Sequence, residues 1–274
     1  MSSDGWAPKL VALDIDGTLL KWVEGAGTTH EEIAPAVGDA VRRARDAGCH
    51  IVLASGRSPH GMTTVADRLG LYLDGEPLWV VASNGAVVFR YPPLEVVREE
   101  TFDAAPAVAA VLERHPNALV AVEERGVGYR VTKEFPFGEL SGEMILTEVD
   151  DLVSAPVSRV IIRDPEATAE DFVALAKELG LHGTDYVVGW TAWLDLAPVG
   201  VSKASGLAYV AEQLGVDAAD VLAIGDGRND IEMLQWAGRG VAMGQAVQPV
   251  QDVADAVTGT VGDDGAATEL ARYF

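Results

Sequence analysis

The chain has 274 residues and a formal net charge of −22, from 42 acidic and 20 basic side chains. This length suits a main domain accompanied by a smaller one rather than a single compact core. Nucleic-acid backbones and anionic membrane surfaces both demand clustered Lys and Arg, so the acidic balance argues against either as a partner. A small anionic ligand would also be repelled at long range, so its site would need a bound cation and one or two basic side chains.

Hydrophobic residues form 49% of the sequence, which is enough for a buried core. The single cysteine, Cys49, begins an apolar run, and we expect a buried small side chain with no disulfide. Residues 1–8 show no apolar run after a basic start, so no signal peptide is expected. No stretch approaches the roughly 20 apolar residues that span a bilayer. We therefore expect a cytoplasmic protein, and no feature predicts an oligomeric state.

The first part of the chain alternates strands and helices. Short apolar runs predict strands at Lys9–Leu13, His50–Ala54 and Trp79–Ala82. Apolar residues at helical spacing predict helices over Glu31–Ala47 and Pro59–Leu69. This order is typical of a parallel sheet with right-handed crossovers.

After residue 85 the rhythm changes to mixed strands and helices. We expect these at Val87–Arg90, Ala104–Arg114, Ala118–Glu123, Val127–Thr132, Ser158–Arg163, Thr168–Leu179, Tyr186–Trp190 and Trp193–Leu196. The first rhythm then returns, with elements at Lys203–Leu214, Val221–Ile224, Asp230–Ala237, Gly240–Met243, Pro249–Ala254 and Ala266–Tyr273. The pattern predicts an α/β fold in which a Rossmann-like parallel-sheet core, residues 1–86 and 196–274, is interrupted by an inserted α+β domain, residues 87–195.

Two aspartates, Asp14 and Asp16, directly follow the first predicted strand. Residues two apart in a strand point to the same side, so the two carboxylates would face one point, which favours Mg²⁺ binding. A calcium-binding EF-hand loop is an alternative, but it needs Gly at its sixth position and Glu at its twelfth. Here Gly17 stands at the fourth and Gly25 at the twelfth. A simple turn would not require an apolar strand directly before it.

Three further signals lie at or near the ends of predicted core strands. Ser55-Gly56-Arg57 offers a hydroxyl and a backbone N–H for a phosphate oxygen, although Ser-Gly is also a common turn. Lys203 opposes the dipole of the helix that it begins, which makes an anionic partner more plausible, although Lys is usually a solvated surface residue. Asp226 follows a buried strand in Gly225–Asp230, where a shared metal would offset the cost of its burial, and helix capping is the alternative. No Walker sequence supports a P-loop NTPase.

Together these four signals resemble the haloacid dehalogenase-like (HAD) hydrolase superfamily, and within it the Cof-type phosphatases with a C2-type α/β cap. The stretches that carry the resemblance are Leu10–Leu20, Val52–Arg57, Ser83–Ala86, Val201–Gly206 and Ile224–Leu234. The resemblance implies that residues 87–195 form a cap that determines substrate specificity. It also implies a Mg²⁺-dependent phosphatase that hydrolyses small phosphomonoesters such as sugar phosphates.

The resemblance assigns a role to each core residue. Asp14 would be the nucleophile that forms an aspartyl-phosphate, and Asp16 the general acid and base. Asp14, Asp16 (through its backbone carbonyl) and Asp226 would hold Mg²⁺, with Asp230 behind them to orient Lys203 or a metal-bound water. The phosphoryl oxygens would be bound by Ser55, Gly56, Lys203 and Asn229.

Substrate contacts beyond the phosphate are less defined. The candidates in the core and in the insert are Arg57, Asn84, Tyr129, Arg130, Lys133 and Trp190. For the four residues of the insert, packing or a surface position is the alternative. For Asn84 the alternative is a turn before Gly85, and for Arg57 a salt bridge at the surface. Two rival functions remain open: a phosphomutase on the same scaffold, and a protein that binds a phosphorylated metabolite without catalysis.

Overall fold

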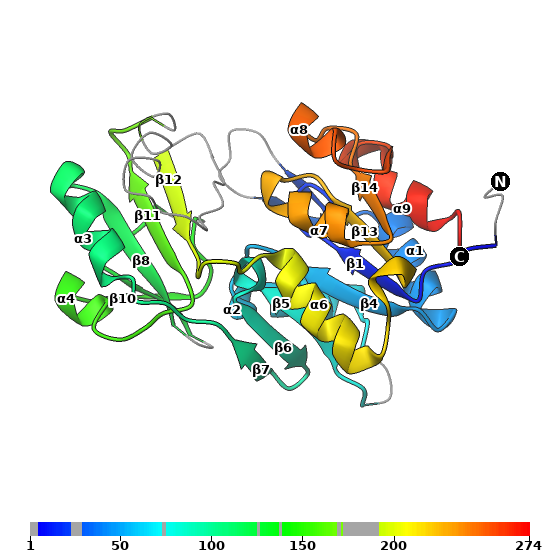
Figure 1. Cartoon of the computed structure of the whole chain (residues 1–274), viewed down its shortest axis with the longest axis horizontal. Coiled ribbons are helices and arrows are strands. Elements are labelled where there is room, and N and C mark those ends of the chain that lie inside the picture. The colour runs from blue at the N-terminus through cyan, green and yellow to red at the C-terminus, as the bar shows by residue number, and fades with distance from the viewer. Residues whose placement is uncertain are drawn as a thin grey trace.

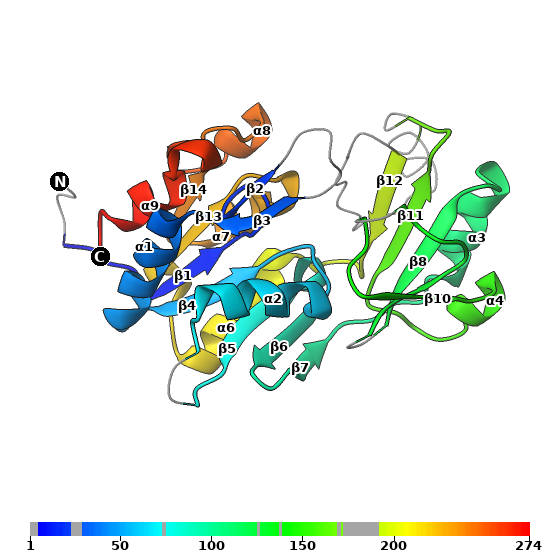
Figure 2. The same cartoon turned by 180° about the vertical axis from the view of Figure 1, so that it is seen from behind.

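The computed structural model describes residues 5–22, 29–72, 75–124, 127–136, 139–168, 171 and 192–274. These residues form an eight-stranded sheet, a five-stranded sheet and a two-stranded pair. Figures 1 and 2 show the two larger sheets at opposite ends of the molecule, with helices on both faces of the first. The chain is thus an α/β protein with a mostly parallel core sheet and a separate inserted mixed sheet.

The core sheet has the order β15-β14-β13-β1-β4-β5-β6-β7. Its strands are β1 Leu10–Leu13, β4 His50–Ala54, β5 Leu78–Ala82, β6 Val87–Tyr91, β7 Glu95–Glu99, β13 Val221–Gly225, β14 Arg239–Ala242 and β15 Ala256–Val257. Neighbours from β15 to β5 run parallel, and β6 and β7 add an antiparallel edge. The parallel strands are short apolar runs because both of their faces are covered.

Helices cover each face of this sheet. One face packs against α1 Pro35–Asp46, α2 Pro59–Leu69 and α9 Gly265–Leu270, and the other against α6 Lys203–Leu214, α7 Ile231–Trp236 and α8 Gln248–Gln251. Alternate residues of β1 serve the two faces: Val11 and Leu13 join the first cluster, whereas Leu10 and Ala12 join the second. Within the described part of the core, single turns of 3₁₀ helix lie at η1 Ser83–Gly85, η2 Ala218–Asp220, η3 Arg228–Asp230 and η4 Val261–Asp263.

We call the five-stranded sheet with its helices the insert. Its strand order is β10-β9-β8-β11-β12. The elements are α3 Ala105–Arg114, β8 Leu119–Glu124, β9 Gly128–Val131, β10 Glu143–Leu146, α4 Val149–Leu152, β11 Val160–Asp164 and β12 Ala192–Leu196. One face of the sheet packs against α3 and α4, and the other carries a smaller cluster around Tyr129 and Ile161.

Most expected elements are present, and β4, α2 and α6 have the expected bounds. The helix expected over Glu31–Ala47 is wrong at its start, because Thr29–Ile33 forms β3 and pairs with β2, Leu20–Trp22. The hairpin β6–β7 belongs to the core sheet, so the separate sheet begins later than the expected boundary at residue 87. The elements expected at residues 186–190 and over most of 168–179 lie outside the described residues. No helix among the described residues is long and apolar enough to cross a membrane.

Candidate active site

The carboxyl ends of neighbouring parallel strands bring the polar residues together. Asp14 follows β1, Ser55 follows β4, Asp226 follows β13, and Gln245 lies shortly after β14. These strands are adjacent in the order β14-β13-β1-β4, so their carboxyl ends meet at one edge. This edge is where open α/β sheets bind their ligands.

Lys203 joins two carboxylates at this edge. Its Nζ donates to Asp14 Oδ1 at 2.7 Å and to Asp230 Oδ1 at 2.6 Å, and its side chain is fully buried. Burial lowers the pKa of Lys203, but Asp14 and Asp230 outweigh burial and raise it above its ordinary value. Burial also raises the pKa of Asp14 well above its usual range, and the Asp230 carboxylate adds to this effect while Lys203 opposes it. One ammonium therefore does not neutralise the surrounding carboxylates.

Asp230 is held by its own loop. Its Oδ2 accepts hydrogen bonds from the backbone N–H of Asp226 at 2.9 Å and of Gly227 at 2.8 Å, while its Oδ1 faces Lys203. Both carboxylate oxygens of Asp230 are therefore occupied within the protein. The arrangement fits a residue that orients Lys203 and the Asp226 loop.

Asp226 lies against the loop that follows β1. A Cβ on Gly17, whose φ is +82°, would lie 2.0 Å from Asp226 Oδ2, so only glycine allows this approach. Gln245 Nε2 donates to the Gly17 carbonyl at 2.6 Å and to Asp226 Oδ2 at 3.1 Å. Burial and Asp230 raise the pKa of Asp226 to about 6, although Gln245 lowers it. Gln245 was not predicted from the sequence, although its position after a core strand could have revealed it.

The Asp16 carboxylate is bound by Arg57 and not by Lys203. Arg57 Nε donates to Asp16 Oδ2 at 2.8 Å, and Arg57 Nη2 donates to Asp16 Oδ1 at 2.7 Å. This is the two-bond geometry that a guanidinium and a carboxylate favour. Both side chains are partly exposed, so the pair lies at the mouth of the carboxylate cluster rather than inside it.

The carboxylates fit a hard divalent cation. Asp14, Asp226 and Asp230 each have a carboxylate oxygen within 4.8 Å of the other two. Oxygen ligands are those that Mg²⁺ prefers. Because both oxygens of Asp230 are occupied, the open ligands come from Asp14 and Asp226. The Asp16 carboxylate faces Arg57. The backbone carbonyl of Asp16, which we expect near the metal, is a separate group that these contacts do not occupy.

The two loops expected to bind phosphate meet at Asn84. Its backbone N–H donates to the Ser55 carbonyl at 3.1 Å, and a Cβ on Gly56 would lie 3.0 Å from Asn84 Oδ1. Asn229 Nδ2 donates to the same Oδ1 at 2.9 Å. The structure thus brings Ser55, Gly56 and Asn229 together around a residue that the sequence suggested only as a substrate contact.

A buried polar group of the insert meets this loop. Arg159 binds Asp195 through Nε at 2.9 Å and Nη2 at 2.6 Å, and Asn84 Nδ2 donates to Asp195 Oδ2 at 3.3 Å. Ser83 Oγ donates to Glu123 at 2.7 Å. Arg159, Asp195 and Glu123 were missed, because charged residues within or beside an apolar strand give no signal of their partners in the sequence.

A model of the haloacid dehalogenase-like hydrolase family matches residues 11–270. The chain belongs to this family. It is 33% identical to phosphoglycolate phosphatase from Natronomonas pharaonis over 96% of each chain. It is 26% identical to 5-amino-6-(5-phospho-D-ribitylamino)uracil phosphatase YitU from Bacillus subtilis, over 97% of this chain and 98% of that one.

Solved structures agree with this assignment. The phosphatase BT1666 from Bacteroides thetaiotaomicron is 26% identical and has a TM-score of 0.77, with 100% of this chain and 97% of that chain covered. The HAD subclass IIB sugar phosphatase BT4131 has the same fold, with a TM-score of 0.78 at 23% identity over 96% of this chain and 98% of that one. This HAD-family protein is a phosphatase that acts on small phosphomonoesters.

The described substrate-contact candidates of the insert each make a side-chain hydrogen bond to another residue of the insert. Tyr129 is buried, with its hydroxyl 3.4 Å from Arg159 Nη1. Arg130 donates to the Asp151 carbonyl on the α4 side of the insert, and Lys133 donates to the Asn117 carbonyl. Trp190 lies outside the described residues.

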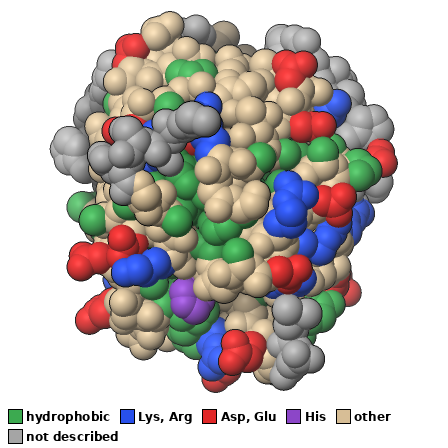
Figure 3. Space-filling view, turned by 90° about the vertical axis from the view of Figure 1, so that its right-hand side faces the viewer, with side chains coloured by type: hydrophobic (Ala, Val, Ile, Leu, Met, Phe, Trp, Pro, Cys, Tyr) green, Lys and Arg blue, Asp and Glu red, His purple; other side chains and the backbone are tan. Residues whose placement is uncertain are grey.

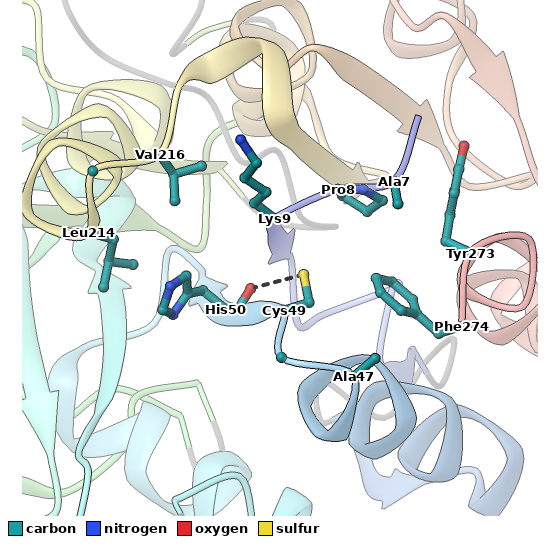
Figure 4. Close-up of a pocket in the computed structure, with 12 residues that line it drawn as sticks. Ala7, Pro8, Lys9, Ala47, Cys49, His50, Leu214, Val216, Tyr273 and Phe274 are labelled. Atoms are coloured by element: carbon teal, nitrogen blue, oxygen red, sulfur yellow. Dashed lines mark hydrogen bonds between the residues drawn. The ribbon is translucent and has the colours of Figure 1, made fainter. Parts of the chain in front are cut away.

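The opposite end of the core differs in character. A cavity of about 530 Å³ lies at the amino ends of β1 and β4, lined in part by Lys9, Cys49 and Phe274 (Figure 4). Cys49 is buried and unpaired, as expected, and burial raises the pKa of its thiol to about 12. On the end of the molecule that carries α1 and α9, acidic and basic side chains are interspersed (Figure 3). The carboxylate cluster lies at the opposite end of the core sheet, where β1 and its neighbours have their carboxyl ends.

Proposed function

We propose that this phosphatase hydrolyses phosphorylated metabolites, such as sugar phosphates, by attack of Asp14 on phosphorus. The observation that carries the proposal is the position of Asp14, which is buried at the end of β1 with one oxygen on Lys203 and the cluster of Asp226 and Asp230 beside it. A carboxylate needs no base to become a nucleophile. Asp14 Oδ1 is held by Lys203, which leaves Oδ2 for the attack or for a cation.

In the proposed reaction, Asp14 forms a bond to phosphorus while the bond from phosphorus to the alcohol oxygen breaks. Asp16 gives its proton to that oxygen, and then takes a proton from the water that hydrolyses the aspartyl-phosphate. Both Asp16 oxygens contact Arg57, so one of these contacts must open before Asp16 can transfer a proton. The incoming phosphate is an anion, which gives Arg57 another partner.

Asp14, Asp226 and the Asp16 carbonyl would hold Mg²⁺, which supplies positive charge against the phosphate dianion when it is bound. Ser55, the Gly56 N–H, Lys203 and Asn229 would bind the phosphoryl oxygens. The insert would be the cap that closes over the core, excludes unproductive water and determines which alcohol is accepted. Its contacts with the loop at Ser83 and Asn84 support this role.

The test is a panel of phosphomonoesters that includes sugar phosphates, 2-phosphoglycolate and an aryl phosphate. Release of free phosphate is measured with Mg²⁺ and with a chelator, and with no bisphosphate activator present, which also separates hydrolysis from mutase activity. Asp14→Asn should abolish hydrolysis while circular dichroism shows an intact fold. Asp164→Asn is a matched control, because Asp164 is equally buried but lies in the insert beside His115. Near-normal turnover by Asp14→Asn would disprove the nucleophile assignment.

A further inference from the structure

Asn84 has contacts that the proposed reaction does not use. It is 3% exposed and adopts a left-handed backbone conformation with a φ of 52°. Its side-chain amide lies between Asn229 in the core and Asp195 in the insert. Left-handed conformations are uncommon for residues other than glycine, although Asn is among those that tolerate them best. The chain therefore holds a buried amide in one fixed place between the two units.

The partners of Asn84 determine which way its amide points. Asp195 is bound at both oxygens by Arg159, so it can only accept hydrogen bonds. Asn84 must therefore turn Nδ2 toward Asp195, at 3.3 Å, and its Oδ1 is left facing Asn229. Because Asn84 Oδ1 is an acceptor, Asn229 must turn its own Nδ2 toward it, and the two atoms lie 2.9 Å apart. The direction of each amide follows from Asp195, whose carboxylate oxygens accept from both Arg159 and Asn84.

We infer that Asn84 is a positioning residue that fixes the orientation of the Asn229 amide, so that Asn229 presents N–H rather than carbonyl oxygen to a phosphate. An amide nitrogen has two N–H groups, and only one is given to Asn84. The second can donate to an anion, whereas a reversed amide would repel the anion with its oxygen. The inference rests on the proposed function, which places Asn229 at the phosphate.

This arrangement also makes the phosphate site depend on the insert. Asp195 lies on β12, the strand from which the chain returns to the core, and its Arg159 partner directly precedes β11. Both are buried, at 2% and 7% exposure. When the insert is seated, this ion pair orients Asn84 and through it Asn229. The phosphate site is therefore complete only with the insert in place.

The test uses Asn84→Gly, which keeps the left-handed backbone and its N–H but removes the amide. Binding of inorganic phosphate in the presence of Mg²⁺ is measured by calorimetry, which requires no turnover. We expect the Kd to rise about tenfold, which corresponds to the contribution of one hydrogen bond to a charged group. For a phosphomonoester, KM should rise by a similar factor while kcat and the pH profile change little, because Asp14 and Asp16 keep their contacts.

Ser83→Gly is the matched control. Ser83 is also buried and left-handed, with a φ of 51°, and it also bonds to the insert, through Glu123. This variant should bind phosphate like the wild type. A comparable loss in Ser83→Gly would overturn the inference, because the effect would then come from the backbone or from any lost contact with the insert.

A double-mutant cycle with Asn229→Ala tests the route of the effect. If Asn84 acts through Asn229, adding Asn84→Gly to Asn229→Ala should weaken phosphate binding little further. Independent effects that multiply, or an unchanged Kd in Asn84→Gly, would overturn the inference. The wild type could bind phosphate, and the cycle could show that Asn84 acts through Asn229, while no ester is hydrolysed. In that case the proposed function fails and the role of Asn84 stands. Lack of phosphate binding by the wild type overturns both.

Discussion

Replacing Lys203 by Met should destabilise the fold as well as stop phosphate binding. The ammonium is fully buried and lies 2.7 Å from Asp14 and 2.6 Å from Asp230. Its removal leaves two buried carboxylates without their cation. Breaking a buried ion pair in this way costs about 3–5 kcal/mol, because the remaining charge is uncompensated. At about 2–4 °C per kcal/mol for a chain of this size, the melting temperature should fall by roughly 10 °C.

The assay is thermal and urea unfolding followed by circular dichroism, in the presence of a chelator so that no metal replaces the lost charge. Lys9→Met is the control, because Lys9 contacts Asp220 at the same distance of 2.6 Å but is 67% exposed. An exposed pair of this kind often contributes nothing measurable. If the two variants lost the same stability, burial would not be what gives the Lys203 contacts their energy.

Three further outcomes are expected. Asp16→Asn should lower kcat by about 10²–10⁴ for alkyl phosphates and by less for an aryl phosphate with a good leaving group, measured as phosphate release. A uniform loss would argue against proton transfer by Asp16. Gly17→Ala should weaken Mg²⁺ binding in a calorimetric titration, because the new Cβ displaces Asp226. In Gly215→Ala, where φ is +65° and no atom lies within 4 Å of the new Cβ, only the free energy of unfolding should fall, by about 1–2 kcal/mol of backbone strain. Cys49, buried and with its thiol pKa raised to about 12, should resist a thiol reagent at pH 8 until urea unfolds the chain, and rapid labelling of the native protein would contradict this.

Elements with strong local signals could be predicted from the sequence. Helix α2 begins where Ser58 caps it and Pro59 follows, and it ends at Gly70 in the left-handed conformation, so both of its bounds have a local cause. The strand β3 could not be predicted in this way. Its residues Thr29–Ile33 are polar except for Ile33, and they form a strand because they pair with β2. Pairing between separate segments leaves no signal in the local hydrophobic periodicity of either segment.

The same limit applies to the hairpin β6–β7. Its mixture of apolar and charged residues would suit the edge of either sheet, and its pairing with β5 decides that it joins the core. The loops of the site could be predicted, because apolar runs locate the strands and the strand ends locate the loops. The contacts within the site, such as Arg57 with Asp16 and Asn84 with Asn229, depend on side-chain directions across loops far apart in the sequence. Their roles in the reaction stay predictions.

The charges of the site explain how so acidic a chain could bind an anion. Four carboxylates, those of Asp14, Asp16, Asp226 and Asp230, stand near two cationic side chains, Lys203 and Arg57. When all are ionised, two negative charges remain before any phosphate arrives. Burial first, and then the neighbouring carboxylates, raise the pKa of Asp14 and of Asp226. One divalent cation would neutralise the two remaining negative charges. The proposed divalent cation would therefore balance the charge of the protein itself as well as that of the substrate, whereas a monovalent ion at the same oxygens would leave the phosphate facing a net negative site.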